Sequence, residues 1–488
     1  MKNIIYTCLL LISLFCTTYT VSGQAENSDP YRLTLQECID AAIKNNIGVK
    51  QSELQAISSK VAIEQAKADR WPSVNGSIGY NYNVGRSINP FTNLYEENPV
   101  SSQNYGLNAN VGLFNGLRVH NTIQRNQIDL EVSQYDLEAV KNNITMDVIS
   151  AYTQILFNTE LLENARFQLE NTNLQLERTR KLVEAGSLPV ANVLELEAQQ
   201  ASGEAEIVNA ENNLALAKLQ LKQLMQMPAS RTLEIVVPEV EVPATEALVM
   251  SVEGVYEIAL EAQPNIKSVE AQISSAEYNV AIARSGYYPS LFLQGSLGTA
   301  YSSVAPDIIP RGGAENVTRI VPTGGFIQGN PEMIVVEAQT VPTEFQDNTY
   351  FNQLNFNFRR FVGVSLSIPI FNNLSVKSSV SNAEIGLENA RLVAINEKNQ
   401  LRQTIEQAYA NAKAASTTYF ARERQVEALQ QSFDNTEIRY NLGAVNALEY
   451  SQALNNLNVA QSDLIRAKYD YIFSLKILDF YEGRPLEF

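Results

Sequence analysis

The sequence has very few of the residues from which catalytic and metal sites are usually built. Histidine occurs once, as His120, and cysteine three times in 488 residues. The chain also lacks a glycine-rich phosphate loop and the Gly-x-Ser-x-Gly turn that presents a nucleophilic serine. His120 stands at an expected helix start with no evident nucleophile beside it. We therefore predict that the protein is not an enzyme and has no catalytic, cofactor-binding or metal site.

Basic residues are in the minority. Lysine and arginine total 36 against 53 aspartates and glutamates, which gives a formal net charge of -17 at pH 7. A chain of this charge is repelled by the phosphates of DNA and RNA. We therefore expect no nucleic-acid partner.

Long hydrophobic runs are missing as well, apart from one at the N-terminus. Lys2 precedes the apolar run Ile4–Cys16, which is shorter than the ~20 residues that a membrane-spanning helix needs. Small residues follow at positions 21–23. This pattern is typical of a secretory signal peptide, and we predict one over residues 1–23 with cleavage after Gly23.

Two of the three cysteines, Cys8 and Cys16, lie in the same N-terminal segment. Lipidation of Cys16 is an open alternative to cleavage after Gly23, although Phe15 stands where a lipidation signal has a small residue. Cleavage after Gly23 removes Cys8 and Cys16 and leaves Cys38 alone. A single cysteine cannot form a disulfide within the chain.

The sequence contains an internal duplication. Thr34–Pro72 and Ser251–Pro289 read alike at an offset of 217 residues, and Phe114–Leu117 matches Phe371–Leu374 at an offset of 257. The second copy therefore carries 40 extra residues between these blocks. We predict a first structural repeat over 24–228, a link over 229–250 and a second repeat over 251–488.

Four segments alternate apolar and polar residues with the period of a β-strand, and we expect strands at about 73–84, 104–114, 290–301 and 355–371. One face of each is apolar and the other is rich in Asn, Ser and Gly. Their length of ~10 residues suits a tilted transmembrane strand. A soluble antiparallel sheet with one wet face is the alternative.

Four strands are too few to close a transmembrane barrel, because the smallest has about eight. An open edge in hydrocarbon leaves backbone N–H and C=O groups unpaired, at several kcal/mol each. If the strands lie in a membrane, several copies of the chain must share one barrel. Strand counting alone allows two copies or three.

The rest of each repeat is expected to be a long helical hairpin. No proline or glycine occurs from Val119 to Ala185, and apolar residues recur there every three or four positions. Gly186 and its counterpart Gly443 stand where each hairpin must turn, as helix C-caps do. The expected apolar positions are Ile144, Val148, Tyr152, Ile155 and Leu162, with Leu194, Leu214, Leu221 and Leu224 in the partner segment Val190–Met225.

The turn segments carry a family resemblance. Residues 180–187 with 193–195, and residues 439–443 with 447–449, resemble the hairpin tips of TolC-like outer-membrane efflux proteins. Residues 366–371 resemble that family's exit from strand to helix. The resemblance runs from about Thr34 to Leu486 and keeps its order in both repeats.

The resemblance implies an α+β membrane protein of the outer membrane. It implies a homotrimer with a 12-stranded β-barrel, four strands from each protomer, that continues into a long periplasmic α-helical coiled-coil barrel. Such a channel is a passive duct for drugs, small molecules or proteins in tripartite efflux or type I secretion. Its partners are a periplasmic adaptor, an inner-membrane pump that supplies the energy, and outer-membrane lipid.

The resemblance also implies a periplasmic entrance at the helix tips. Glu449 and Gln452 match the family positions where acidic residues ring the pore, so this chain has one acid where two are usual. Tyr440 matches a tip residue that braces the closed state, and Gly186 and Gly443 mark the tips that dock the adaptor. Ordinary helix packing for Tyr440 and a solvated surface position for Glu449 are the alternatives.

The sequence leaves open the role of two connecting segments and one alternative function. Residues 85–103 and 302–354 join the strand pairs, and we hypothesise that the second, which is long and rich in proline, partly covers the pore. The alternative function is a secreted coiled-coil adhesin or structural protein with a small soluble sheet. The sequence does not specify the cargo or the pump.

Overall fold

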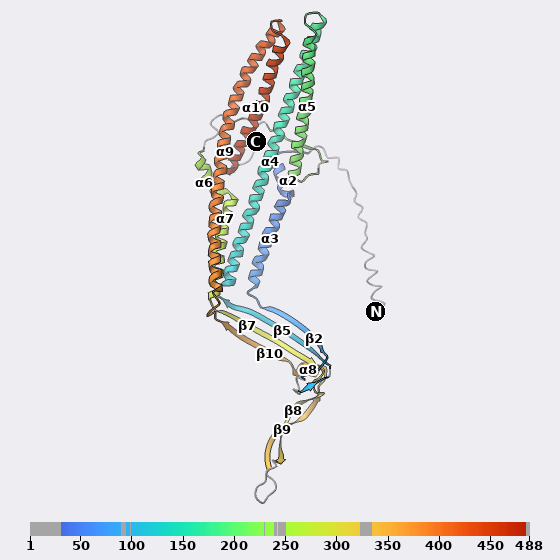
Figure 1. Cartoon of the computed structure of the whole chain (residues 1–488), viewed down its shortest axis with the longest axis vertical. Helices are drawn as coiled ribbons and strands as arrows, with labels where there is room; N and C mark the ends of the chain where they lie inside the picture. Colours follow the sequence, from blue (N-terminus) through green and yellow to red (C-terminus); the bar gives the residue numbers. More distant parts are fainter. Residues whose placement is uncertain are drawn as a thin grey trace, which may run out of the picture. The chain divides into compact units, whose positions relative to one another are not determined.

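The computed structural model describes residues 31–88, 94–97, 99–228, 230–238, 242, 250–322 and 334–484. The expected signal peptide and most of the link over 229–250 lie outside these residues. The chain forms two compact units, and the helices α4 (Arg118–Glu184) and α9 (Ser375–Asn441) run through both (Figure 1). We call the part made of residues 51–139 and 263–401 the sheet unit, and the remainder the helical unit.

The centre of the sheet unit is an antiparallel sheet of four strands in the order β10-β7-β5-β2 (Figure 1). Each repeat contributes one hairpin, and β5 of the first repeat pairs with β7 of the second. The strands are β2 (Ser73–Asn83), β5 (Val100–Asn115), β7 (Ser290–Ser302) and β10 (Arg359–Ser367).

The register of the sheet gathers the apolar residues on one face. Residues directly opposite each other on neighbouring strands share a face. Leu107 of β5 lies opposite Leu297 of β7, and Leu293 lies opposite Val364 of β10. Asn and Ser residues such as Asn108 and Ser296 pair on the other face. The sheet therefore has one apolar and one polar face, as the alternation indicates.

The strand predicted at about 355–371 is wrong at both ends. Residues Tyr350–Phe356 form the helix α8, because Thr349 caps it by accepting a hydrogen bond from the N–H of Asn352. At the other end β10 stops at Ser367, and the following Pro369 has no N–H to donate to a neighbour. The strand therefore covers 359–367 only.

The long connection over 302–354 is largely ordered as a hairpin, where the sequence suggested a loop. The strands β8 (Ile308–Pro322) and β9 (Ile334–Asp347) pair in antiparallel fashion. The N–H of Asn348 donates to the carbonyl of Asp307 at 2.7 Å and closes the base. From Ile308 to Asp347 the hairpin spans 40 residues, the same number by which the second repeat is longer. In the connection over 85–103, β3 (Ser87–Ile88) pairs with β4 (Tyr95–Glu96).

Four helices continue the four strands of the sheet unit. They are α3 (Ile47–Ala68), the first part of α4, α7 (Pro264–Arg284), which ends in the 3-10 turn η1 (Ser285–Tyr287), and the first part of α9. Polar contacts fix the order α3-α4-α7-α9, which matches the order β2-β5-β7-β10 of the strands they adjoin. These contacts join Ser59 to Ser133 at 2.8 Å, Ser275 to Asp129 at 2.5 Å and Lys398 to Glu270 at 2.7 Å.

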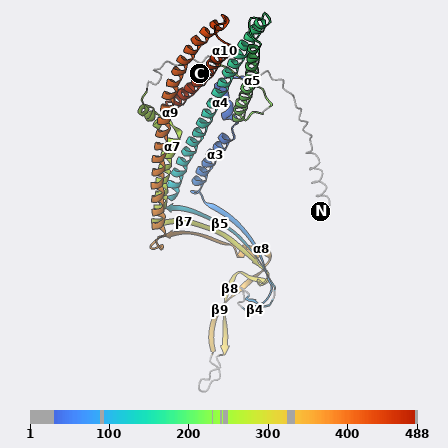
Figure 2. The same ribbon diagram turned by 45° about the horizontal axis from the view of Figure 1, so that its top comes forward.

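The helical unit contains two antiparallel helix pairs. The second part of α4 packs beside α5 (Ala191–Leu224), and the second part of α9 beside α10 (Ala447–Tyr481), as both views show (Figures 1 and 2). The apolar positions predicted on α4 are all buried, and so is Leu221 of α5. Leu194 differs, because 61% of its surface is exposed. No helix in the described part combines the length and apolar character needed to cross a membrane.

The helical unit also contains short elements. They are β1 (Tyr31–Leu33), which pairs in parallel with β6 (Leu233–Ile235), and the helices α2 (Leu35–Asn45) and α6 (Val252–Ala262). A capping box of Thr34 and Glu37 starts α2. The hydroxyl of Tyr152 on α4 donates to the carbonyl of Val236, just after β6. Cys38 is fully buried beside these contacts.

Candidate functional site

Both helical hairpins turn through the same backbone motif. Gly186 and Gly443 have φ of +70° and +72°, in the left-handed region that side chains disfavour. The N–H of each glycine and of the residue after it bonds back to the last turn of the helix; for the second tip these bonds reach Tyr440 and Arg439 at 3.0 and 2.8 Å. This is a Schellman motif, and it explains why glycine stands at both tips.

The second tip is built on a small aromatic core. The rings of Tyr440 on α9 and Tyr450 on α10 stack with centroids 4.8 Å apart. Phe433 packs against Tyr450 at 5.5 Å, and Leu454 completes the cluster. The sequence analysis selected Tyr440 but missed Tyr450. The signal that could have identified Tyr450 is its position directly after Glu449, which the sequence analysis had assigned to the same tip. The cluster holds α9 and α10 together immediately behind the turn.

The hydroxyl of Tyr440 is buried without a hydrogen-bond partner among the described residues, and only 6% of the side chain is exposed. Burying a polar group without a partner costs about 1–3 kcal/mol. Burial also raises the pKa of Tyr450 well above its usual range, and the nearby charge of Glu437 adds to the shift. Tyr450 therefore stays neutral at physiological pH, and the tip core acts through packing.

Glu449 lies at the start of α10, outside this core. Its N–H donates to the side chain of Asn446, which caps the helix, at 2.9 Å. Its carboxylate forms an ion pair with Arg439 at 3.6 Å, and both side chains are more than half exposed. Gln452 is also exposed, one helical turn further on. The structure therefore presents Glu449 and Gln452 together to solvent, on one side of the tip.

The first tip lacks these features. Val190 stands at the N-cap of α5 and makes no side-chain capping bond. The first hairpin has a different ion pair, in which Arg180 binds Glu197 at 2.7 Å. The two tips thus share the glycine turn and differ in the residues that follow it, so the candidate gate residues belong to the second tip alone.

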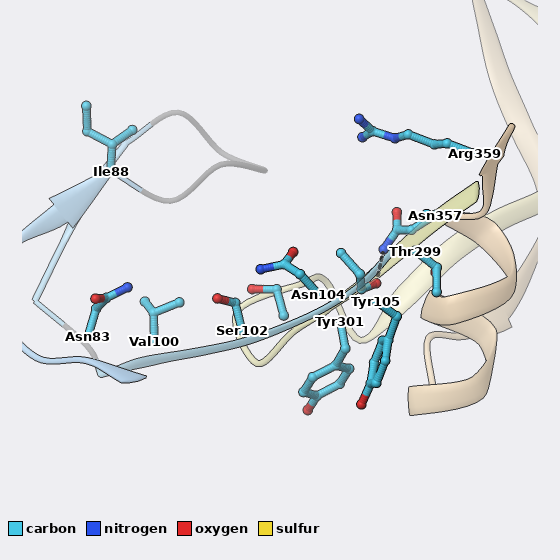
Figure 3. Close-up of a pocket in the computed structure, with 13 residues that line it drawn as sticks. Asn83, Ile88, Val100, Ser102, Asn104, Tyr105, Thr299, Tyr301, Asn357 and Arg359 are labelled. Carbon is cyan, nitrogen blue, oxygen red and sulfur yellow. Dashed lines mark hydrogen bonds between the residues drawn. The ribbon is translucent and has the colours of Figure 1, made fainter. Parts of the chain in front are cut away.

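A recess of about 700 Å³ lies on the polar face of the sheet, near the ends of β5 and β7 (Figure 3). Asn357 donates to the carbonyl of Ala300 at 2.8 Å, and Arg359 is the one charged side chain among the described residues that line the recess. Tyr105 and Tyr301 point together to the other side of the sheet (Figure 3). The sequence gave no signal for Arg359.

The chain matches known proteins over most of its length. The model of the outer membrane efflux protein family matches residues 38–225 and 352–483. Outer membrane efflux protein BepC of Brucella suis is 21% identical over 466 residues, which cover 95% of this chain and 87% of BepC. Outer membrane protein TolC of Escherichia coli is 22% identical over 469 residues, which cover 95% of this chain and 84% of TolC.

Solved structures share the fold. A structure of CusC has a TM-score of 0.71 at 18% identity and covers 95% of this chain and 96% of its own. The outer membrane protein VceC of Vibrio cholerae has a TM-score of 0.69 at 16% identity, with coverages of 93% and 97%. The family match takes in the long helices α4, α5, α9 and α10 and both tips, so the chain belongs to the outer membrane efflux protein family.

Proposed function

We propose that three copies of this chain form one passive export channel in the outer membrane. Each copy contributes four strands to a shared 12-stranded barrel that continues into a periplasmic barrel of helices. Membership of the family establishes an outer-membrane efflux protein, and its members are channels rather than enzymes. The alternative of a secreted adhesin finds no support among these relatives.

The observation that carries the proposal is the pair of open sheet edges. Among the described residues, β2 and β10 each have a neighbouring strand on one side only. The apolar face continues to both edges, where Ile78 and Val362 are about four-fifths exposed. In hydrocarbon, roughly five unpaired backbone groups per edge would cost several kcal/mol each. Copies joined edge to edge remove this cost.

The helices beside these edges support the same assembly. On α3, Leu54, Ile57 and Val61 are each more than half exposed, and they recur at three- and four-residue spacing. On α9, Ile385 and Leu392 are similarly exposed, seven residues apart. These are the outer helices of the order α3-α4-α7-α9. Apolar rows at both ends of the layer fit a neighbouring copy on each side.

The second tip supports an entrance gate. Three copies of Glu449 around an axis would repel one another and attract cations, while Gln452 adds no charge. The packed ring of Tyr440 would brace the closed state behind them. The exposed turns at Gly186 and Gly443 are the surfaces that we propose dock a periplasmic adaptor, and an inner-membrane pump would supply the energy.

The proposal is tested on protein purified in detergent. We expect a particle of three copies by light scattering and discrete conducting steps in a planar bilayer, with cations preferred over anions. The same chain refolded without detergent should aggregate, because its apolar sheet face then lies in water. A stable monomer in plain buffer that produces no conductance would reject the channel in favour of the adhesin.

A further inference from the structure

We propose that copies of the chain join through β10 of one copy and β2 of the next, in a register set by the internal duplication. Ser365 of one copy then lies opposite Gly79 of the next, and Ser367 lies opposite Ser77. The inference rests on the proposed function, which requires copies to share one sheet, and it adds the residue pairs at the joint.

The first step is that β2 and β5 pair in the same register as their counterparts β7 and β10. In the first repeat Val74 of β2 lies opposite Ala109 of β5. The offsets of 217 and 257 residues carry this pair to Leu291 and Leu366, which lie opposite each other in β7 and β10. The duplication therefore predicts strand pairing residue by residue, with no slip between the repeats.

The second step uses the joint that the chain itself contains. β5 of the first repeat pairs with β7 of the second, and Asn108 lies opposite Ser296. The counterpart of β5 is β10, and the counterpart of β7 is β2. Adding 257 to Asn108 gives Ser365, and subtracting 217 from Ser296 gives Gly79. A joint between copies that repeats the joint within a copy must place these two residues opposite each other.

The third step is a check on the faces of the sheet. The same register places Leu366 opposite Ile78 and Val362 opposite Tyr82, so apolar residues meet on one face. Polar and small residues meet on the other, where Gly363 faces Asn81. A slip of one residue would set Val362, Val364 and Leu366 against the polar face of the next strand, so the face pattern excludes it.

The fourth step concerns the residues after β10. Their counterparts in the first repeat, the last five residues of β5, pair with β7 across a bulge between Gly112 and Phe114. The counterpart of Gly112 is Pro369, and bulges and edges are where a sheet tolerates proline. Phe371 is 77% exposed against 43% for its counterpart Phe114. We infer that residues 368–372 complete the strand when β2 of the next copy covers them.

Four cysteine substitutions test the register: S365C, S367C, S77C and G79C. They lie on the polar face, which aqueous oxidants reach, and a Cβ added at Gly79 has nothing within 4 Å. The matched pairs are S365C with G79C and S367C with S77C. The swapped pairs, S365C with S77C and S367C with G79C, use the same four substitutions.

Directly opposed residues lie about 4.5–5.5 Å apart between Cα atoms, within reach of a disulfide, whereas diagonal neighbours lie ~7–8 Å apart, beyond it. After oxidation in detergent we expect both matched pairs to give covalent dimers and trimers on denaturing gels, at least tenfold more than either swapped pair. The four single variants measure the background, which includes the buried Cys38.

The outcomes separate the register from the channel. Trimers that crosslink through a swapped pair, or through no pair, would overturn the register and leave the channel standing. A protein that stays monomeric in detergent and forms no crosslink with any pair would overturn both. Protection of the amides of residues 370–372 from hydrogen exchange in the trimer is the second expected result.

Discussion

The aromatic ring and the hydroxyl of Tyr440 contribute differently to the stability of the second tip. We predict that Tyr440→Phe keeps the stack on Tyr450 and leaves the melting temperature unchanged or higher, because it removes a buried hydroxyl that has no partner. Tyr440→Ala removes the ring and should cost about 3–5 kcal/mol of unfolding free energy. Thermal denaturation of both variants in detergent checks this, and a Phe variant as unstable as the Ala variant would contradict it.

Glu449 and Gln452 allow the proposed gate to be tuned in both directions. We predict that Glu449→Gln lowers the preference of the channel for cations and that Gln452→Glu raises it. Neither change should alter stability by more than about 1 kcal/mol, because exposed ion pairs such as that of Glu449 with Arg439 contribute little. Reversal potentials in a salt gradient measure the preference.

The control for these variants is Glu197→Gln, which breaks the exposed ion pair with Arg180 near the first tip and changes the net charge equally. If Glu197→Gln shifts the reversal potential as much as Glu449→Gln does, the effect belongs to the overall charge and the gate is rejected.

Cys38 provides a prediction in pH. Burial, and next the charge of Glu37, raise the pKa of its thiol to about 12. An unfolded thiol has a pKa of ~8.5, so the neutral buried form stabilises the fold fully below that pH, and this contribution is lost as the pH rises towards the folded value. At pH 8 we expect no alkylation of Cys38 by maleimide in the folded protein and complete alkylation in urea, measured by mass on a chain without residues 1–23. Rapid labelling of the folded protein would refute the burial.

At the scale of elements, the same turn precedes both long helices but tolerates different residues. Gly116 and Asn373 are counterparts, with φ of +63° and +52°. A Cβ at Gly116 would lie 2.7 Å from the carbonyl oxygen of Ser285 and 2.8 Å from the Cβ of Tyr288. We predict that Gly116→Asn destabilises the protein by about 1–3 kcal/mol through overpacking.

The matched control is Asn373→Gly, which should change stability by less than about 1 kcal/mol, because both residues adopt the left-handed conformation. Denaturant titrations of the two variants provide the comparison. A gain in stability for Asn373→Gly as large as the loss for Gly116→Asn would show that the backbone conformation, and not the contact with Ser285, makes glycine necessary at 116.

The elements that the sequence predicts well are those governed by a simple period. The buried row from Ile144 to Leu162 follows directly from helical spacing, and the apolar face of the sheet follows from alternation. Errors occur where a local signal interrupts the period. Thr349 starts a short helix in place of a strand, and the apolar residues Phe356 and Phe358 do not reveal this because they continue the alternation.

The candidate site was predictable in part. The glycines at both tips are readable because one backbone conformation requires them, and their φ angles agree. Tyr450 was missed because stacking on Tyr440 joins two helices across the turn, and no period within one helix records such a contact. Arg359 was missed because the recess it lines is formed by residues from several strands.

At the scale of the whole molecule, the hairpin of β8 and β9 can be removed without breaking the sheet. Asp307 and Asn348 are already hydrogen-bonded at its base, so two glycines can replace residues 308–347. On the hypothesis that the hairpin partly covers the pore, we predict that the shortened protein still forms trimers and has a higher single-channel conductance and a greater passage of antibiotics. Unchanged conductance and unchanged passage would reject this covering role.

The pairing of β5 with β7 has a consequence for how the chain folds. Contacts within the first hairpin, such as Ser73 with Asn110, join residues 37 positions apart, whereas Ser101 and Ser303 beside the central seam are 202 apart. Closing the longer loop costs about 1.5 kcal/mol more in chain entropy. We expect each repeat to fold as its own nucleus, with the seam between them forming later and setting the rate at which copies become competent to associate.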